Sequence, residues 1–156
     1  MEFFKLIFTM LIAYSPALVS RAFMMNTPDR WYLEIVRPSF SPPGWVFGVV
    51  WGILYFMIGL SLFLFCIAQG DTLQKRPGFI FFGIQLLLNA AFMPVCFGMH
   101  SFLGGFIICV LLAIFLVLTI IQFYKISKIA AYLLIPYLMW GLFAIVLSYN
   151  VYILNP

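Results

Sequence analysis

The sequence predicts an all-α membrane protein, a bundle of five transmembrane helices. Of its 156 residues, 66% are hydrophobic and only 8% are charged, and the mean hydropathy is +1.18. A soluble domain of this size cannot bury so much apolar surface, so we expect the bilayer to be its solvent. The charges are grouped, and five apolar runs between the groups each approach the roughly 20 residues that a spanning helix needs.

These runs lie at about residues 3–25, 43–68, 78–97, 102–124 and 129–154. The first run has no small-residue cleavage motif and carries Glu2 where a signal peptide is basic, so we expect a retained helix. A structured loop is expected over residues 26–42, because prolines fix φ and remove backbone donors around Pro38 and Pro42. The later connections, of which Gly70–Gly78 is the longest, are short, and sequential helices should therefore be antiparallel.

No linker, low-complexity tract or internal repeat divides the chain, and residues 1–156 are expected to form a single domain. The net charge of +4 concerns orientation in the membrane and anionic headgroups rather than nucleic acid. Basic residues favour an N-terminus inside, with Lys5, Lys75, Arg76, Lys125 and Lys128 on that side against Arg21, Arg30 and Arg37 on the other. Since no targeting sequence is visible, the default location is a bacterial cytoplasmic membrane.

Conventional catalysis and metal binding have little support. The three cysteines (Cys66, Cys96 and Cys109) lie in apolar runs without paired spacing, which is typical of small buried side chains. His100 is the only histidine and falls in a short turn, where a solvated loop residue is the simpler interpretation than a haem ligand. We therefore expect no metal site and no required cofactor.

Polar and aromatic side chains inside the helices are informative because they are scarce. Gln85 and Asn89 stand four residues apart and share a helix face. Two further i, i+4 stripes are Phe47–Trp51–Tyr55 and Pro136–Trp140–Ala144. From the helical rise, Trp51 and Asn89 lie about 12 Å and Trp140 roughly 20 Å below the loop side of the membrane. Each stripe alone is compatible with packing or interhelical hydrogen bonds, but together they favour a pocket for a flat hydrophobic ligand.

Three segments resemble the translocator protein family, the TspO or tryptophan-rich sensory proteins related to the peripheral-type benzodiazepine receptor. They are WYLEIVRPSFSPPGWVFGVVWGILY (Trp31–Tyr55), QLLLNAAF (Gln85–Phe92) and AAYLLIPYLMWGLFAIVLSYNVYILN (Ala130–Asn155). The resemblance covers nearly the whole chain. It implies a five-helix bundle, a homodimer, and a pocket covered by the first loop that binds porphyrins, such as protoporphyrin IX or haem, and benzodiazepine-type ligands.

Carried over by position, the resemblance implies a ligand site at Trp31, Tyr32, Pro42, Phe47, Trp51, Tyr55, Asn89, Phe92, Cys109, Trp140 and Ala144. Trp51 and Trp140 match the family tryptophans linked to light-dependent degradation of protoporphyrin. Phe92 stands where many members have Trp, and the C-terminus lacks the sterol-recognition pattern of animal members. The resemblance therefore implies a bacterial member rather than a cholesterol transporter.

Three functions follow as hypotheses. The first is a sensor, regulator or handler of tetrapyrroles. The second is enzymatic: oxidative, light-dependent breakdown of protoporphyrin IX with Trp51 and Trp140 as catalytic residues. The third is a carrier of a small solute or lipid, which the missing repeat and the uncharged helix interiors disfavour.

Overall fold

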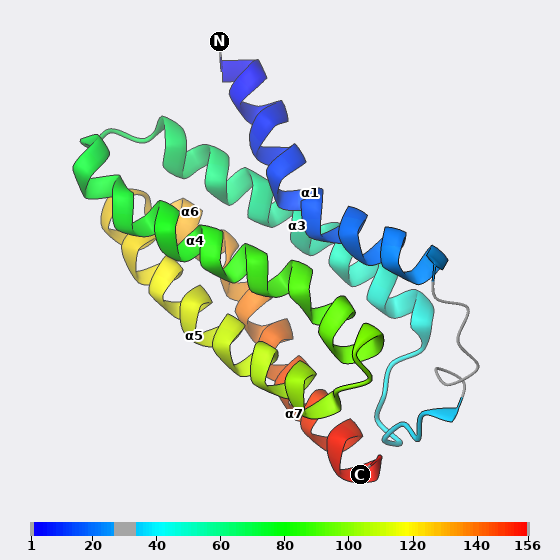
Figure 1. Cartoon of the computed structure of the whole chain (residues 1–156). Helices are drawn as coiled ribbons and strands as arrows, with labels where there is room; N and C mark the ends of the chain where they lie inside the picture. The colour runs from blue at the N-terminus through cyan, green and yellow to red at the C-terminus, as the bar shows by residue number, and fades with distance from the viewer. Residues whose placement is uncertain (1, 27–33, 156) are drawn as a thin grey trace.

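A computed structural model of the chain describes residues 2–26 and 34–155, the side chains of residues 25 and 26 excepted. Its elements are α1 (Glu2–Asn26), α3 (Gly44–Ile67), α4 (Thr72–Met93), the π-helical turn η1 (Pro94–Gly98), α5 (Phe102–Ile126), α6 (Lys128–Leu133) and α7 (Ile135–Leu154). Five helical stretches in the described part are long and apolar enough to cross a membrane, α4 continuing into η1 and α6 into α7. The predicted all-α fold with five spanning helices is confirmed (Figure 1).

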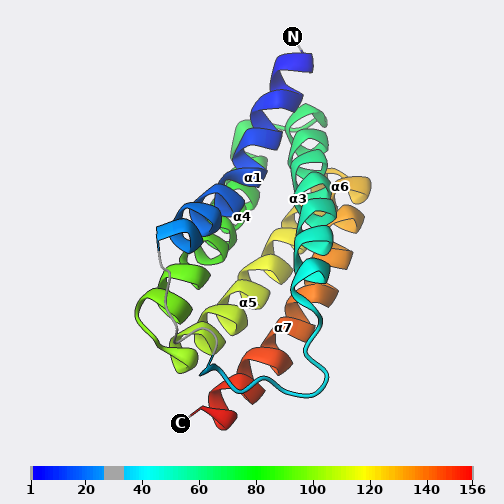
Figure 2. The ribbon, with the colours of Figure 1, turned by 90° about the vertical axis from the view of Figure 1, so that its right-hand side faces the viewer.

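The helices form a bundle whose two ends differ. Helix α1 packs on α3 and α4, α4 runs along α5, α5 runs along α7, and α6 packs against α3. The N-terminus and the C-terminus lie at opposite ends (Figures 1 and 2). We call the end that holds the chain before α3, the turn before α5 and the C-terminus the loop end.

Helix α1 bends away from the bundle toward its N-terminus (Figure 1). Pro16 lies inside this helix and has no N–H to give to the carbonyl of Ile12. The hydroxyl of Ser15 donates to that carbonyl instead, at 2.7 Å. The bend therefore leaves no carbonyl unpaired at the proline, which matters in a medium without water.

Helix α4 begins at Thr72, earlier than the start near residue 78 that the turn residues of Gly70–Gly78 indicated. The N–H of Lys75 donates to the Asp71 carbonyl at 3.1 Å and closes a first turn. The ammonium group of Lys75 then reaches back to the end of α3, where it donates to the carbonyls of Cys66 (3.1 Å) and Ala68 (2.5 Å). A cation at a helix C-terminus is favourable, and this contact holds the two helices together at their connection.

Prolines accompany breaks in the third and the fifth span. Pro94 follows α4 and starts the π-helical turn η1, so the run predicted as one helix over 78–97 changes character before its end. The predicted helix over 129–154 is divided at Leu134, just ahead of Pro136. Between α5 and α6 only Ser127 is non-helical, and its hydroxyl accepts from the N–H of Ala130 as an N-cap.

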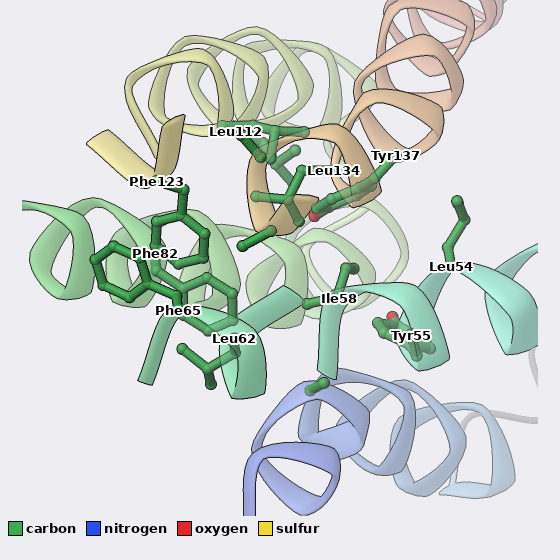
Figure 3. Packing of buried hydrophobic residues seen from close by; sticks show 14 residues of the cluster. Leu54, Tyr55, Ile58, Leu62, Phe65, Phe82, Leu112, Phe123, Leu134 and Tyr137 are labelled. Atoms are coloured by element: carbon green, nitrogen blue, oxygen red, sulfur yellow. The ribbon is translucent and has the colours of Figure 1, made fainter. Parts of the chain in front are cut away.

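The core is aromatic toward one end and polar toward the middle. Phe65 and Phe123 stack with centroids 3.9 Å apart, and Phe82 stacks on Phe123 at 5.9 Å. Figure 3 shows these three rings together at one side of the cluster, with Tyr55 and Tyr137 at the other. These rings lie toward the end of the bundle that is opposite the loop end. The buried hydroxyls of Tyr55 and Tyr137 lie between the rings and the loop end.

Candidate functional site

A hydrogen-bonded network lies in the middle of the bundle. The hydroxyl of Tyr55 donates to Oδ1 of Asn89 at 2.9 Å, and Nδ2 of Asn89 donates to the hydroxyl of Tyr137 at 2.7 Å. The hydroxyl of Tyr137 donates to Oε1 of Gln85 at 3.0 Å. All four side chains are buried, with 6% or less of their surface exposed. We call this set the central network; it joins α3, α4 and α7.

Large aromatic side chains line the loop-end side of the central network. Trp51 stacks on Tyr55 with centroids 5.1 Å apart and meets Tyr137 edge-on at 5.9 Å. One turn earlier on α3, Phe47 meets Trp140 of α7 at 5.7 Å, and Trp140 contacts Phe143 at 5.2 Å. We call Phe47, Trp51, Trp140 and Phe143 the aromatic cluster. It lies between α3 and α7, two helices whose backbones have few close contacts with each other.

The part of the first loop that the structure describes reaches this cluster. Phe40 contacts Phe143 with centroids 6.4 Å apart. Val36 is held by Asn155, whose Oδ1 accepts from the Val36 N–H and whose Nδ2 donates to the Val36 carbonyl, both at 2.9 Å. The loop is thus attached to the end of α7 and lies over the aromatic cluster. Trp31 and Tyr32, two of the predicted ligand residues, lie outside the described residues.

Helix α1 packs beside the central network through Tyr14. The hydroxyl of Tyr14 donates to the carbonyl of Gly52 at 2.9 Å, and its ring lies 5.6 Å from that of Tyr55. Tyr14 was not expected at the site, because a single tyrosine in an apolar run gives no spacing signal. Its contact extends the site from α3, α4 and α7 to α1.

Of the predicted ligand residues, the structure brings together Phe47, Trp51, Tyr55, Asn89 and Trp140. Sequence reasoning left out Tyr137, the residue that connects Asn89 to Gln85. The signal was present: Tyr137 precedes Trp140 by three residues, which places both toward one side of a helix. Instead, the proposed stripe began at Pro136, which the structure exposes.

The remaining predicted residues lie around this group. Phe92 is half-buried near η1, and a Cβ built on Gly105 of α5 would lie 3.5 Å from its ring. Cys109 is buried on α5, with its Sγ 3.5 Å from the hydroxyl oxygen of Ser148 on α7. Pro42, just before α3, and Ala144, on α7, are half-buried. Phe92 thus lies on α4 and faces α5, and Cys109 lies on α5 and faces α7.

A separate cavity of about 510 Å³ lies at the loop end, between the first loop, the turn before α5 and the end of α7. Its lining includes Glu34, His100, Ser101 and Tyr152. His100 has a φ of +50°, a left-handed conformation that turns the chain before Ser101 caps α5 through the Gly104 N–H. Among the described residues no group of three or more histidine, cysteine or acidic side chains could hold a metal ion.

The model of the TspO/MBR family matches residues 6–154. The tryptophan-rich protein TspO of Chlorobaculum tepidum is 42% identical over 130 residues, covering 83% of this chain and 82% of the relative. The protein of the same name from Archaeoglobus fulgidus is 36% identical over 99% of both chains. The human translocator protein is 36% identical over 86% of this chain and 80% of its own length.

The match over almost the whole length agrees with the five apolar helices and with the motifs that carry the resemblance. The chain therefore belongs to the TspO/MBR family and is an integral, multi-pass membrane protein.

Proposed function

We propose that this protein binds a planar tetrapyrrole, with protoporphyrin IX as the test ligand, between α3, α4 and α7 and beneath the first loop, and that it acts as a sensor, regulator or handler of that ligand. The observation that carries the proposal is the position of the aromatic cluster. Phe47 meets Trp140 edge-on, and Trp51 stacks on Tyr55, whose buried hydroxyl donates to the amide of Asn89. An apolar, aromatic wall with a few fixed polar groups suits a flat ring system that has polar atoms.

The surroundings of the cluster support a ligand that enters from the loop end. The described part of the loop lies over Phe143 and is tied to α7 through Asn155, so the loop must move before a ring system can enter. Arg21, near the end of α1, and Arg37, in the loop, are the basic side chains of the described loop end that would attract the propionates of a porphyrin. Benzodiazepine-type ligands, which are also flat and largely apolar, would use the same aromatic wall.

Titration of the purified protein in lipid nanodiscs with protoporphyrin IX in the dark tests the proposal. The porphyrin absorbance is the readout, because it does not depend on the tryptophans that are replaced. Saturable binding is expected, and Trp51→Phe, Trp140→Phe and Asn89→Ala should each weaken it, by about tenfold for a central contact. Trp45→Phe is the matched control, since Trp45 lies on the same helix as Trp51 but is 72% exposed. Equal affinity in all four variants and the wild type would remove the site.

Oxidative breakdown of protoporphyrin is a second candidate, favoured by one contact. Trp51 stacks on Tyr55 at 5.1 Å and touches Tyr137, so an oxidised indole would have phenols beside it. Illuminating the bound complex with oxygen tests this candidate. Loss of the porphyrin bands that depends on Trp51 and Trp140 would support the enzyme, whereas a constant spectrum would leave binding alone.

A further inference from the structure

The hydrogen bonds of the central network all run in one direction. Tyr55 donates to Asn89, Asn89 donates to Tyr137, and Tyr137 donates to Gln85. The chain ends at Nε2 of Gln85, a buried amide nitrogen that has no hydrogen-bond partner among the described residues. Gln85 has none of its surface exposed. A buried donor without an acceptor is destabilising, and buried polar groups without partners are rare in native structures.

The same four side chains have a second arrangement with equal contacts. A half-turn of a carboxamide exchanges its oxygen and nitrogen at nearly the same positions, and a hydroxyl hydrogen rotates freely. If both amides turn and both hydroxyls rotate, Gln85 donates to Tyr137, Tyr137 donates to Asn89, and Asn89 donates to Tyr55. The three contacts, at 2.9, 2.7 and 3.0 Å, are retained.

Reversal moves the unpaired donor from one end of the network to the other. Nε2 of Gln85 gains a partner, and only its carbonyl oxygen is left, a group whose under-satisfaction is better tolerated. The hydroxyl of Tyr55 is released as a donor. Tyr55 is the member of the network that stacks on Trp51, and its ring also lies 5.6 Å from that of Tyr14. The donor that the reversal releases thus belongs to the tyrosine whose ring stacks on Trp51 of the aromatic cluster.

We propose that the central network reverses when a ligand brings a hydrogen-bond acceptor to Tyr55. Gln85 is the positioning residue: through Tyr137 and Asn89 it sets the direction of the hydrogen bonds when no ligand is bound. The proposal rests on the proposed function and adds a ligand class to it: flat aromatic compounds with an unprotonated ring nitrogen or a carbonyl oxygen at the edge that meets Tyr55. An equally flat hydrocarbon cannot accept the hydrogen bond and leaves the network in its original direction.

Acridine and anthracene are a matched pair of probes, because they differ only by a ring nitrogen in place of a C–H group. At alkaline pH, where the acridine nitrogen is unprotonated, wild-type protein in nanodiscs should prefer acridine. In Gln85→Met the hydroxyl of Tyr137 has no acceptor at position 85 and turns to Asn89, so the network is reversed before any ligand binds. The preference for acridine over anthracene should then rise further, by about 3- to 10-fold, the equivalent of one ordinary hydrogen bond.

Tyr55→Phe is the control, since it removes the donor and should abolish the preference. If Gln85 only packs, Gln85→Met would change the affinities for acridine and anthracene by the same factor, and an unchanged ratio would overturn the proposal. A second readout is the side-chain NH₂ resonance of Gln85, identified by its loss in Gln85→Met. Saturation with acridine should shift it downfield as Nε2 gains an acceptor, and anthracene should not; no shift with acridine would also overturn the proposal.

Failure of this inference and failure of the proposed function can be told apart. Saturable protoporphyrin IX binding together with an unchanged acridine-to-anthracene ratio in Gln85→Met rejects the reversal alone. Absence of saturable binding of both protoporphyrin IX and acridine rejects the ligand site and the reversal with it.

Discussion

Asn155, near the end of the chain, holds Val36 by two hydrogen bonds across a separation of 119 residues. Its Oδ1 accepts from the Val36 N–H and its Nδ2 donates to the Val36 carbonyl, each at 2.9 Å. One side-chain amide thus pairs with a main-chain peptide group in the way that a neighbouring strand would. The same Nδ2 also donates to the Val151 carbonyl of α7 at 2.8 Å, which fixes the amide relative to the helix.

Removal of this clamp should speed ligand exchange more than it changes affinity. In Asn155→Ala the loop loses two hydrogen bonds to α7, so it opens more often, while the aromatic cluster stays intact. We expect the association and dissociation rates of protoporphyrin IX to rise together by about 3- to 10-fold, the equivalent of about 1 kcal/mol in the opening equilibrium. Stopped-flow absorbance measures both rates. Asn150→Ala is the control, because Asn150 donates to Val146 within α7; a fall in affinity without faster exchange would contradict the clamp.

Asn89 should matter for stability as well as for binding. Replacing it by Leu leaves the hydroxyl of Tyr55 without its acceptor and takes a donor from Tyr137, both in the buried interior. The expected loss is about 1–3 kcal/mol, seen as a lower thermal unfolding temperature in detergent. In the double variant Asn89→Leu/Tyr55→Phe the hydroxyl that lacks an acceptor is gone. The loss of stability in the double variant should therefore be smaller than the sum of the losses in the two single variants. Full additivity would show that the two side chains do not interact.

Lys75 should stabilise the connection between α3 and α4. Lys75→Met keeps the apolar stem but removes the ammonium group that donates to the carbonyls of Cys66 and Ala68. A loss of about 1–2 kcal/mol is expected from hydrogen bonds to a charged group at a helix C-terminus. Lys125→Met is the comparison, since Lys125 is exposed and donates to Gln122 on its own helix. An equal effect of both substitutions on the unfolding temperature would argue against capping.

Two glycines of α4 should respond to alanine in opposite directions. A Cβ at Gly78 would lie 2.7 Å from the ring of Phe65, which is fully buried and stacked on Phe123 and therefore has no room to move. Gly78→Ala should destabilise the protein by about 1–3 kcal/mol. A Cβ at Gly83 meets nothing within 4 Å, and Gly83→Ala should be neutral or stabilising by up to about 1 kcal/mol. Thermal unfolding of both variants decides, and a stabilised Gly78→Ala would refute the tight contact.

The helical architecture could be predicted because a spanning helix is recognised in a sequence by the length and the apolar composition of its segment. The pairing of Asn89 with the Trp51–Tyr55 stripe was accessible for a related reason: residues four apart share a face, and buried polar groups need partners. The beginning of α4 was missed because the charged residues before Pro77 resemble a loop. Only the position of the α3 C-terminus shows that Lys75 lies within α4 and donates to the last carbonyls of α3.

The site was harder to predict where it depends on helix rotation and on distant contacts. Tyr137 is fully buried while Pro136 is exposed, because the break at Leu134 sets how α7 is turned after it. No local pattern reports that rotation. The Asn155–Val36 clamp has no sequence signal either, since its partners come together only when the first loop crosses the end of the last helix.

The bend of α1 has a consequence for how the protein meets membranes of different thickness. Because Ser15 already satisfies the Ile12 carbonyl that Pro16 leaves, no backbone hydrogen bond has to break when the first half of the helix changes its tilt. That half exposes large apolar side chains, among them Phe3, Phe4, Phe8 and Leu11. The residues ahead of Thr9 can therefore follow a thinner or thicker hydrocarbon layer by tilting, while Met10, beside Gly59, and Tyr14 stay packed on α3. Hydrophobic mismatch is thus absorbed at the N-terminus and kept away from the ring systems in the middle of the bundle.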